Sequence, residues 1–225
     1  MKNNTPEGAV RCPDGTFLVE PVMPMGRLDA EALETITSVV KRFGLPGVRL
    51  TAAQRLMIEG IPEDRVEDVI SALGGVCGTH PLKISACRGR GNCRRGVKDT
   101  YAMAERLEAL VAAVGKTPAK LKAGLSGCNR CCGGSYIRDI GLVGTAGGWT
   151  LVFGGNGGRR VRCGDELLTG ASDEQVLEAL GALLAFYRRE AEKGERTARF
   201  VERIGVAALL RVLHGKGTGP EPTAG

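Results

Sequence analysis

The apolar positions of residues 11–75 alternate between strand spacing and helix spacing. Short apolar runs predict strands at 17–20, 48–50 and 55–59. Asp29 can cap a helix that Gly44 ends, and its apolar positions are Leu33, Ile36, Val40 and Phe43. Pro62 begins a second helix with an apolar face at Val66, Val69, Ile70 and Leu73. The order strand, helix, strand, strand, helix predicts a helix-covered sheet of the ferredoxin-like type.

Residues 76–213 show a second set of alternating patterns. Strands are predicted at 83–86, 122–125, 140–143 and 149–153, the last two as a hairpin. A helix is predicted after Cys93, ended by Gly115 and Pro118, with its inward positions at Val97, Tyr101, Leu107, Leu110 and Val114. Ser172 and Gln175 form a capping box for a helix through Tyr187. One last helix is predicted to carry Phe200, Val201, Ile204, Leu209 and Leu213.

These patterns predict an α/β (α+β) protein in two parts. The first part is a ferredoxin-like half-domain at 11–75, and the second is a larger domain at 76–213 that ends in helices. The tail at 214–225, rich in Gly and Pro, is predicted to be disordered.

Composition narrows the class of protein. Hydrophobic residues make up 43% and charged residues 25% of the 225 residues, as in ordinary globular proteins. The net charge of +6 suits anionic substrates or acidic electron carriers. It would also permit nucleic-acid binding, but no basic helix face is interleaved with aromatic residues, so we expect no nucleic-acid partner.

The expected cellular compartment decides how the cysteines are interpreted. No apolar run approaches the ~20 residues of a membrane span, and the first ten residues are polar and lack the apolar core of a signal peptide. We therefore expect a cytoplasmic protein without a membrane span. Structural disulfides are rare in the cytoplasm, so the 8 cysteines point to metal or redox chemistry.

Four cysteines form two spaced pairs. Cys87 and Cys93 make C-x5-C, and Cys128 and Cys132 make C-x3-C, each just after a predicted strand. Two such loops at one sheet edge can offer four thiolates to one point, which suits an iron–sulfur cluster or zinc. Zinc or a redox dithiol stays open because Cys128 and Cys131 also form C-x-x-C. The unpaired Cys12, Cys77 and Cys163 are interpreted as small apolar residues.

Two glycine-containing segments resemble phosphate sites without matching them. Gly115-Lys116-Thr117 resembles the end of a P-loop, but Leu110 stands where that motif needs Gly. The run 154–158 is glycine-rich without the G-x-G-x-x-G spacing of dinucleotide-binding loops. No nicotinamide or flavin domain is visible, so electrons must come from a separate donor.

At these motifs the sequence resembles the sirohaem-containing sulfite and nitrite reductases. The shared segments are RLTAAQR at 49–55, CRGRGNC at 87–93, KLKAGLSGC at 120–128, CNRCC at 128–132, RDIGLVG at 138–144 and GGW…GGNGG at 147–158. The nearest resemblance is to the small, single-module assimilatory-type sulfite reductases, including RTARFVERIG at 196–205. It covers roughly residues 12–213 and implies that 76–213 is a sirohaem–[4Fe-4S] domain.

The resemblance also implies the cofactors and their ligands. A [4Fe-4S] cluster would be held by Cys87, Cys93, Cys128 and Cys132, and Cys132 would also ligate the iron of sirohaem. The expected reaction is the six-electron reduction of sulfite to sulfide, fed by an external donor such as a ferredoxin or small cytochrome. Nitrite reduction to ammonia is the alternative, because both anions suit the same site.

Several other residues are expected to serve this site. Lys120 and Lys122 lie on one face of a strand and match the family's Lys-x-Lys, so they are expected to bind substrate and organise protons, as are Lys83 and Arg55. The residues expected to approach the sirohaem are Arg49, Thr51, Gln54, Gly155, Asn156 and Gly157. Solvated surface charges, a plain turn and a hairpin loop are the simpler interpretations of these residues.

Differences from the family leave alternatives open. Arg88 and Ala53 replace a usual Pro and Arg, and Cys131 is a spare thiol that could compete as a ligand. Larger relatives fuse two modules, whereas this chain has one, so a second subunit could cover the sirohaem as a homo-oligomer. A cluster-only electron-transfer or sensor module and a zinc adaptor are the rivals from other classes. The sequence leaves open the substrate preference, the donor, the resting axial ligand and the pathway.

Overall fold

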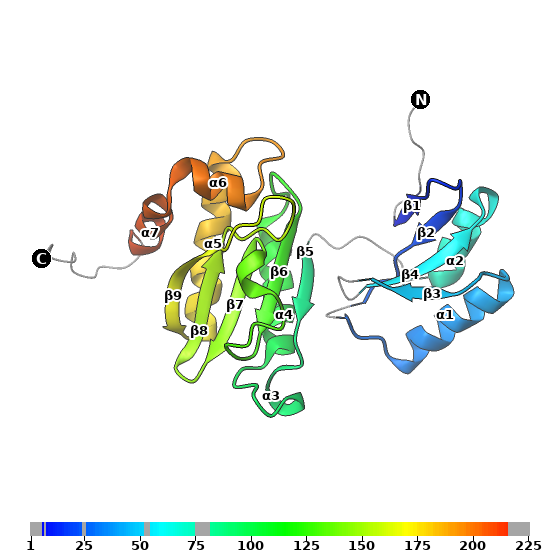
Figure 1. Ribbon diagram of the computed structural model, residues 1–225, viewed down its shortest axis with the longest axis horizontal. Coiled ribbons are helices and arrows are strands. Elements are labelled where there is room, and N and C mark those ends of the chain that lie inside the picture. Colours follow the sequence, from blue (N-terminus) through cyan, green and yellow to red (C-terminus); the bar gives the residue numbers. More distant parts are fainter. Residues whose placement is uncertain (1–5, 7, 24–25, 52–54, 75–81, 216–225) are drawn as a thin grey trace, which may run out of the picture. The chain divides into compact units, whose positions relative to one another are not determined.

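A computed structural model describes residues 6, 8–23, 26–51, 55–74 and 82–215. The chain divides into two compact units, which are Met1–His80 and Pro81–Gly225. They are called the N-terminal unit and the C-terminal unit below. Each unit has its own sheet and its own helices, as Figure 1 shows.

The N-terminal unit is built on an antiparallel four-stranded sheet with the order β1-β2-β4-β3. The strands are β1 (Ala9–Arg11), β2 (Phe17–Val19), β3 (Val48–Leu50) and β4 (Leu56–Ile61). In β4 Leu56 and Ile58 are buried in alternation, and Ile61 is buried after a register shift against β2, so the strand extends beyond the predicted 55–59. The three predicted strands are confirmed, and β1 is an additional edge strand.

Two helices cover this sheet. They are α1 (Ala30–Arg42) and α2 (Val66–Leu73), the latter preceded by the 3-10 turn η2 (Glu63–Arg65). Asp29 caps α1, since its side chain accepts a hydrogen bond from Ala32 N at 2.9 Å. The expected apolar face of α1 needs one correction, because Leu33 is 49% exposed and Val39 is buried instead. Leu33 lies in the first turn of the helix, to one side of its buried stripe.

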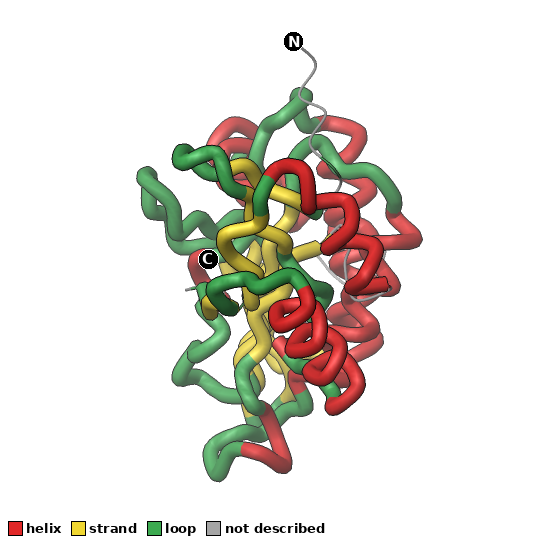
Figure 2. The backbone as a smooth tube through the Cα atoms, turned by 90° about the vertical axis from the view of Figure 1, so that its right-hand side faces the viewer, coloured by secondary structure: helices red, strands yellow, loops and turns green. Residues whose placement is uncertain are grey.

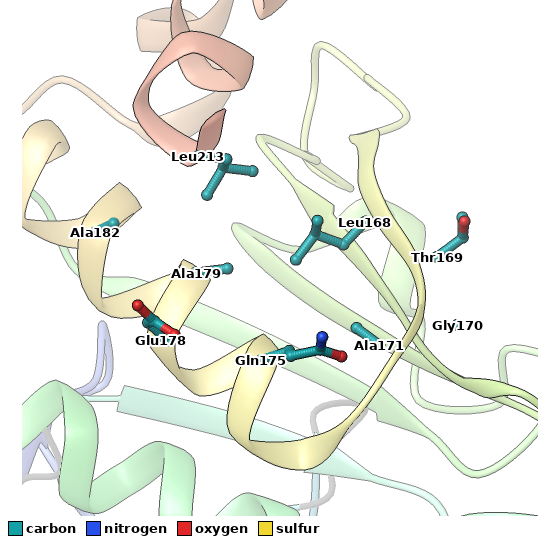
Figure 3. Close-up of a pocket in the computed structure, with 9 residues that line it drawn as sticks. All are labelled: Leu168, Thr169, Gly170, Ala171, Gln175, Glu178, Ala179, Ala182 and Leu213. Carbon is teal, nitrogen blue, oxygen red and sulfur yellow. The ribbon is translucent and has the colours of Figure 1, made fainter. Parts of the chain in front are cut away.

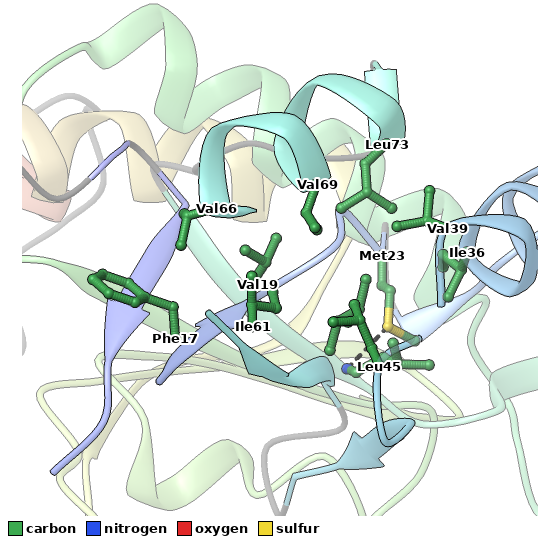
Figure 4. Close-up of a cluster of buried hydrophobic side chains, with 12 residues drawn as sticks. Phe17, Val19, Met23, Ile36, Val39, Leu45, Ile61, Val66, Val69 and Leu73 are labelled. Carbon is green, nitrogen blue, oxygen red and sulfur yellow. Dashed lines mark hydrogen bonds between the residues drawn. The ribbon is translucent and has the colours of Figure 1, made fainter. Parts of the chain in front are cut away.

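The core of the N-terminal unit lies between the sheet and these helices. Figure 4 shows side chains from β2, β4, α1 and α2 meeting in one cluster. Its buried members are Phe17, Val19, Met23, Ile36, Val39, Leu45, Leu56, Ile58, Ile61, Val66, Val69 and Leu73. The expected ferredoxin-like half-domain is thus a separately packed unit with its own apolar core.

The C-terminal unit is built on a mixed five-stranded sheet with the order β5-β6-β7-β8-β9. β5, β6 and β7 run parallel, and β8 and β9 continue the sheet antiparallel. The strands are β5 (Leu82–Ala86), β6 (Leu121–Ser126), β7 (Ile140–Thr145), β8 (Gly148–Phe153) and β9 (Asp165–Ala171). The predicted hairpin of β7 and β8 is confirmed by their antiparallel register.

Helices cover one face of this sheet. The helices of this unit are the short turn α3 (Gly89–Asn92) at the edge of the sheet, α4 (Thr100–Val114), α5 (Asp173–Glu190), α6 (Thr197–Ile204) and α7 (Val206–His214). α4 and α5 pack side by side behind the strands in Figure 1, and Figure 2 colours the helices red and the strands yellow. The expected capping box of Ser172 and Gln175 begins α5.

The structure corrects three expectations for this unit. The helix after Cys93 begins only at Thr100, because Asp99 caps it, and Val97 is 42% exposed outside it. The predicted last helix is two helices, since Gly205 at φ 80° breaks it after Ile204. The sequence did not predict β9, because its apolar residues do not alternate as in a regular strand. In the structure the register of β9 against β8 shifts twice.

No helix in the described part of the chain is long and apolar enough to cross a membrane. The structure describes the chain as far as residue 215, so most of the tail predicted to be disordered lies outside the described residues.

Candidate functional site

The two cysteine motifs begin at neighbouring strand ends. β5 and β6 are parallel with Ala86 opposite Leu125, so Cys87 and Cys128 leave the same edge of the sheet. The backbone N–H of Cys87 donates to Leu125 O at 3.0 Å, and the N–H of Gly127 points to Cys87 Sγ at 3.1 Å. The structure thus brings the first cysteine of each pair to one sheet edge, and the convergence of all four thiols stays a prediction.

Backbone contacts tie the first cysteine loop to the second. Val97 N and Lys98 N both donate to Gly127 O, at 2.8 and 3.2 Å. A Cβ on Gly127 would lie 2.9 Å from both Gly89 Cα and Lys98 O, so only glycine permits this approach. A Cβ on Gly144 of β7 would meet Gly127 O at 2.7 Å from the other side. Tight packing at Gly127 therefore brings the two loops together.

The thiols differ in their surroundings. Cys93 accepts a backbone hydrogen bond from Arg95, which lowers the pKa of its thiol, and the charges of Arg88 and Arg95 lower it further. Thiolate is the form that binds metal, so this setting favours ligation. Cys131 differs, because burial raises the pKa of its thiol, with smaller effects from Cys128 and Cys132.

Cys131 occupies the tight point of the second loop. Among the described residues it is the one non-glycine with a positive φ, at 53°. Its N–H donates to Cys128 O at 3.3 Å, and its own carbonyl accepts from Gly134 N at 2.8 Å. The Cys131 thiol lies 3.5 Å from Asn129 O within its own loop. Cys131 therefore forms the turn between the two expected ligands, Cys128 and Cys132, through its backbone, and its thiol contacts the same loop.

The donor set fits an iron–sulfur cluster. All seven cysteines in the described residues are free, and none is fully buried. Within the same residues no three His, Cys, Asp or Glu side chains form a closed metal-binding group. What the fold supplies is two adjoining loops with thiols on one sheet edge, the chemistry that [4Fe-4S] clusters require.

The expected substrate lysines lie at the opposite end of the same strands. Lys83 and Lys122 are register partners on β5 and β6, so their side chains share one face of the sheet. Lys120 immediately precedes β6, and all three lysines are exposed. Lys122 lies about 13 Å along the strand from Ser126, at ~3.3 Å per residue. The structure thus groups the lysines with one another but not beside the cysteines.

Arg138 joins these lysines on the open face of the sheet. A Cβ on Gly124 would meet Arg138 Cγ at 3.0 Å, so the Arg138 side chain lies over Gly124, two residues beyond Lys122. In the described part of the chain, Arg138 Nε is the one buried side-chain polar atom without a hydrogen-bond partner. Such a donor favours an anionic acceptor, and the carboxylates of sirohaem or an oxyanion fit it. Sequence reasoning missed this residue, although it begins the RDIGLVG segment.

Asp139 fixes the adjacent backbone and is also absent from the sequence-predicted site. Its side chain is 1% exposed and pairs with Arg196. It also accepts hydrogen bonds from Lys122 N at 2.8 Å and from Thr197 Oγ1 at 2.6 Å. Asp139 therefore connects the lysine-bearing strand with the start of α6. The two Asp139 oxygens are thus engaged by Arg196, Thr197 and the backbone of Lys122.

The expected cofactor contacts of the N-terminal unit serve that unit itself in the structure. Arg49 pairs with Glu59 across β3 and β4. Arg55 is 7% exposed and lies 3.7 Å from the Glu20 carboxylate. The hydroxyl of Thr51 accepts from Arg55 N at 3.1 Å. Gln54 lies outside the described residues. The contacts of Arg49 and Thr51 with sirohaem and of Arg55 with the substrate stay predictions.

The glycine loop after β8 approaches its own chain. A Cβ on Gly155 would clash with the carbonyls of Tyr136 and Arg138, and one on Gly157 would lie 3.1 Å from Ile137. Asn156 pairs by backbone with Arg162 and donates from Nδ2 to Arg160 O at 2.6 Å. This loop therefore supports the segment that presents Arg138, and its contact with a macrocycle stays a prediction.

A separate cavity of about 400 Å³ lies between β9, α5 and α7. Figure 3 shows Leu168 and Ala171 facing Ala179 and Leu213 across it. Its lining contains no cysteine, lysine or arginine, so it offers neither thiolate ligands nor cations for an anionic substrate.

Two family models match nearly all of the chain. "Nitrite/Sulfite reductase ferredoxin-like half domain" matches residues 11–76, and "Nitrite and sulphite reductase 4Fe-4S domain" matches residues 77–218. The chain is 34% identical over 219 residues to "Sulfite reductase, assimilatory-type" of Nitratidesulfovibrio vulgaris, with 95% of this chain and 100% of that protein covered. It is 37% identical to "Nitrite reductase [NAD(P)H]" of Bacillus subtilis, of which it spans 25%.

Solved structures share the fold. The Mycobacterium tuberculosis NirA protein aligns with a TM-score of 0.77 at 22% identity, covering 94% of this chain and 42% of that one. Dissimilatory sulfite reductase I aligns with a TM-score of 0.74 at 16% identity, covering 93% of this chain and 72% of that one.

Fold, cysteine motifs and family models together define a ferredoxin-like half-domain followed by a 4Fe-4S redox domain. The chain belongs to the nitrite and sulfite reductase family. The expected fold class is confirmed, as are a [4Fe-4S] cluster and sirohaem as its cofactors. The resemblance seen in the sequence is thereby confirmed as kinship over both units.

Proposed function

We propose that this protein reduces sulfite to sulfide with six electrons from an external carrier. The observation that carries the proposal is the meeting of the two cysteine loops at adjoining ends of β5 and β6. It is supported by full-length similarity to an assimilatory-type sulfite reductase.

The cluster ligands in this proposal are Cys87, Cys93, Cys128 and Cys132. All four belong to loops that the Gly127 backbone joins, and Cys132 is also the thiolate that would meet the sirohaem iron. Sirohaem coupled to the cluster supplies the iron that binds the substrate and the one-electron steps. Cys131 serves the turn between ligands and is not one of them.

The cations of the open sheet face bind anions in this proposal. Sulfite loses its three oxygens as water, so the site needs positive charge and protons. Lys120 and Lys122 hold protons at their Nζ atoms, and Lys83 lies beside Lys122 in the register. Arg138 offers a fixed, buried N–H to an anionic oxygen. Arg55 is buried in the N-terminal unit beside the Glu20 carboxylate, and its action on the substrate stays a prediction.

Nitrite reduction to ammonia is the second candidate. It is favoured by the similarity to nitrite reductases, including 37% identity to the Bacillus subtilis protein. Nitrite is also a small oxyanion that takes six electrons, so it needs the same cations. We place the reaction in the cytoplasm, with a ferredoxin or small cytochrome as donor.

The first test is spectroscopic. Anaerobically purified protein should contain iron, labile sulfide and a tetrapyrrole that acid–acetone extracts as sirohaem. Reduced methyl viologen should then drive sulfite to sulfide, with nitrite measured in parallel. A preference for nitrite would select the second candidate. An iron–sulfur protein without sirohaem, made in a host that synthesises sirohaem, would refute both reductases and favour an electron-transfer module.

A further inference from the structure

The segment that carries Arg138 crosses the open face of the sheet. It passes through the 3-10 turn η4 (Ser135–Ile137), which contacts β6, β7 and β8. The side chain of Arg138 lies over Gly124 of β6. Tyr136, two residues earlier, reaches the other way, and its hydroxyl donates a hydrogen bond to the Glu166 carboxylate of β9. The segment is thus held between the second and the last strand of the sheet.

The two ends of this segment are fixed by buried groups. The Ser135 hydroxyl donates to Leu142 O at 2.9 Å and lies 2.8 Å from the Ser126 hydroxyl. At the other end the Asp139 carboxylate is 1% exposed and pairs with Arg196. The three residues between these ends are exposed or partly exposed. The direction in which Arg138 points therefore depends on how this middle stretch is held.

Tyr136 holds the middle stretch through two hydrogen bonds to one region. Its carbonyl accepts from Gly164 N at 2.8 Å, just before β9, and its hydroxyl donates to Glu166 within β9. The hydrogen bond to Glu166 and partial burial raise the pKa of Tyr136 to about 12. The phenol therefore keeps its proton near neutral pH and remains a donor to the Glu166 carboxylate.

We propose that Tyr136 is a positioning residue for anion binding, which holds this segment so that Arg138 Nε faces the anion. The inference rests on the proposed function, since the anion is a carboxylate of sirohaem or the substrate. Arg138 Nε is buried and has no hydrogen-bond partner within the described residues. Holding the backbone two residues away lowers the conformational freedom that the Arg138 side chain must lose when it binds an anion.

Glu166 allows positioning to be told apart from charge. Its carboxylate is exposed and negative, so by charge alone it opposes the binding of a nearby anion. As the acceptor for Tyr136 it has the opposite effect, and its removal weakens anion binding. A glutamine at this position keeps an acceptor oxygen for the Tyr136 hydroxyl while removing the charge.

The test compares Tyr136→Phe, Glu166→Ala and Glu166→Gln in the holoenzyme. Glu178→Gln, at an exposed carboxylate of α5, is the matched control. Tyr136→Phe and Glu166→Ala should weaken anion binding about 2- to 10-fold, the equivalent of one hydrogen bond. Lower sirohaem content per chain identifies a carboxylate of sirohaem as the anion, and a raised sulfite dissociation constant identifies the substrate. Glu166→Gln and the control should both behave as the unchanged protein.

A double variant separates positioning from a general structural role. If Tyr136 acts through Arg138, then Tyr136→Phe should have no further effect on anion binding in an Arg138→Met background. Equal effects in both backgrounds would overturn the inference. So would unchanged sirohaem content and sulfite affinity in Tyr136→Phe, or tighter anion binding in Glu166→Ala.

Failure of the proposed function would look different. If the unchanged protein held no sirohaem and reduced neither sulfite nor nitrite, backbone hydrogen exchange would still test the role of Tyr136. Ile137 N donates to Gly134 O, and Gly164 N donates to Tyr136 O. In Tyr136→Phe both amides should exchange about fivefold faster or more, with the amides of α5 unchanged. Equal exchange in the two proteins would refute the inference.

Discussion

The backbone N–H of Gly127 lies 3.1 Å from the sulfur of Cys87. The contact joins the two cysteine motifs, which are far apart in sequence, because Gly127 immediately precedes Cys128. Hydrogen bonds to the ligand sulfurs help to set the reduction potential of an iron–sulfur cluster, so this amide would tune a cluster bound at Cys87. Gly127 thus both positions the second motif and contacts a proposed ligand of the first.

The first prediction concerns Gly127. Gly127→Ala places a Cβ 2.9 Å from Gly89 Cα and Lys98 O, so the cysteine loops must separate. We expect about 1–3 kcal/mol of destabilisation from the overpacking and a large loss of iron and labile sulfide per chain. Urea unfolding and metal analysis measure the two effects.

Gly181→Ala is the matched control for this prediction. Gly181 lies within α5, where an added Cβ meets Leu110 Cδ1 at an ordinary 3.7 Å. Alanine there should leave the cluster intact and favour the helix slightly. Full cluster occupancy in Gly127→Ala would show that the close approach of the loops is unnecessary for ligation.

The second prediction separates the adjoining thiols of the CNRCC segment. Cys128→Ser should remove a cluster ligand and abolish the iron–sulfur absorption. Cys131→Ser should retain it, because the Cys131 thiol contacts Asn129 O in its own turn. Cys163→Ser, at an exposed thiol, is the control for cysteine loss alone. Loss of absorption in Cys131→Ser with retention in Cys128→Ser would reverse the proposed ligand assignment.

The sequence alone predicted the cysteine end of the site. Cysteine spacing and strand patterns both depend on residues that are close together in the chain. C-x5-C and C-x3-C directly follow two apolar runs that became β5 and β6. A parallel pair necessarily brings its carboxyl ends to one edge, so the meeting of Cys87 and Cys128 follows from topology.

The remaining site residues depend on packing that no local pattern encodes. Arg138 reaches the lysine face because Gly124 leaves room for it, a contact between residues on different strand connections. Asp139 is recognised by Arg196 and Thr197, almost sixty positions away, so its burial is visible only in the fold. The pairing of Arg49 with Glu59 is likewise visible only in the fold, and the expected contact of Arg49 with sirohaem stays a prediction.

The third prediction tests the buried donor of Arg138. Arg138→Met keeps the length of the side chain and removes the N–H groups, so the anion that Nε binds should be lost. A charge-assisted hydrogen bond of about 1.5–3 kcal/mol corresponds to roughly a 10- to 100-fold change in affinity. Extracted sirohaem per chain and the sulfite dissociation constant, from spectral titration, are the two measurements.

The two measurements distinguish the source of the anion. Lower sirohaem content with normal sulfite affinity in the occupied fraction identifies a carboxylate of the macrocycle. Normal sirohaem content with weakened sulfite binding identifies the substrate oxyanion. Arg189→Met, at an exposed arginine of α5, is the control. An Arg138→Met protein normal in both respects would remove Arg138 from the site.

The fourth prediction concerns the buried carboxylate of Asp139. Asp139→Asn keeps the shape but removes the charge that pairs with Arg196 and weakens acceptance from Lys122 N and Thr197 Oγ1. We expect a loss of about 3 kcal/mol in the free energy of unfolding, as for the breaking of a buried ion pair. Urea unfolding measures it.

Thr197→Val is the comparison for Asp139→Asn, because it removes one neutral donor and leaves the ion pair with Arg196 in place. Its cost should be about 1 kcal/mol, the typical net value of a single hydrogen bond. Because Lys122 N is held by Asp139, the Asn variant should also weaken sulfite binding beyond what Thr197→Val does. Equal stability losses in the two variants would mean that the Asp139 charge contributes nothing beyond its hydrogen bonds. Unequal losses with identical sulfite affinity would confine Asp139 to holding α6 against the sheet.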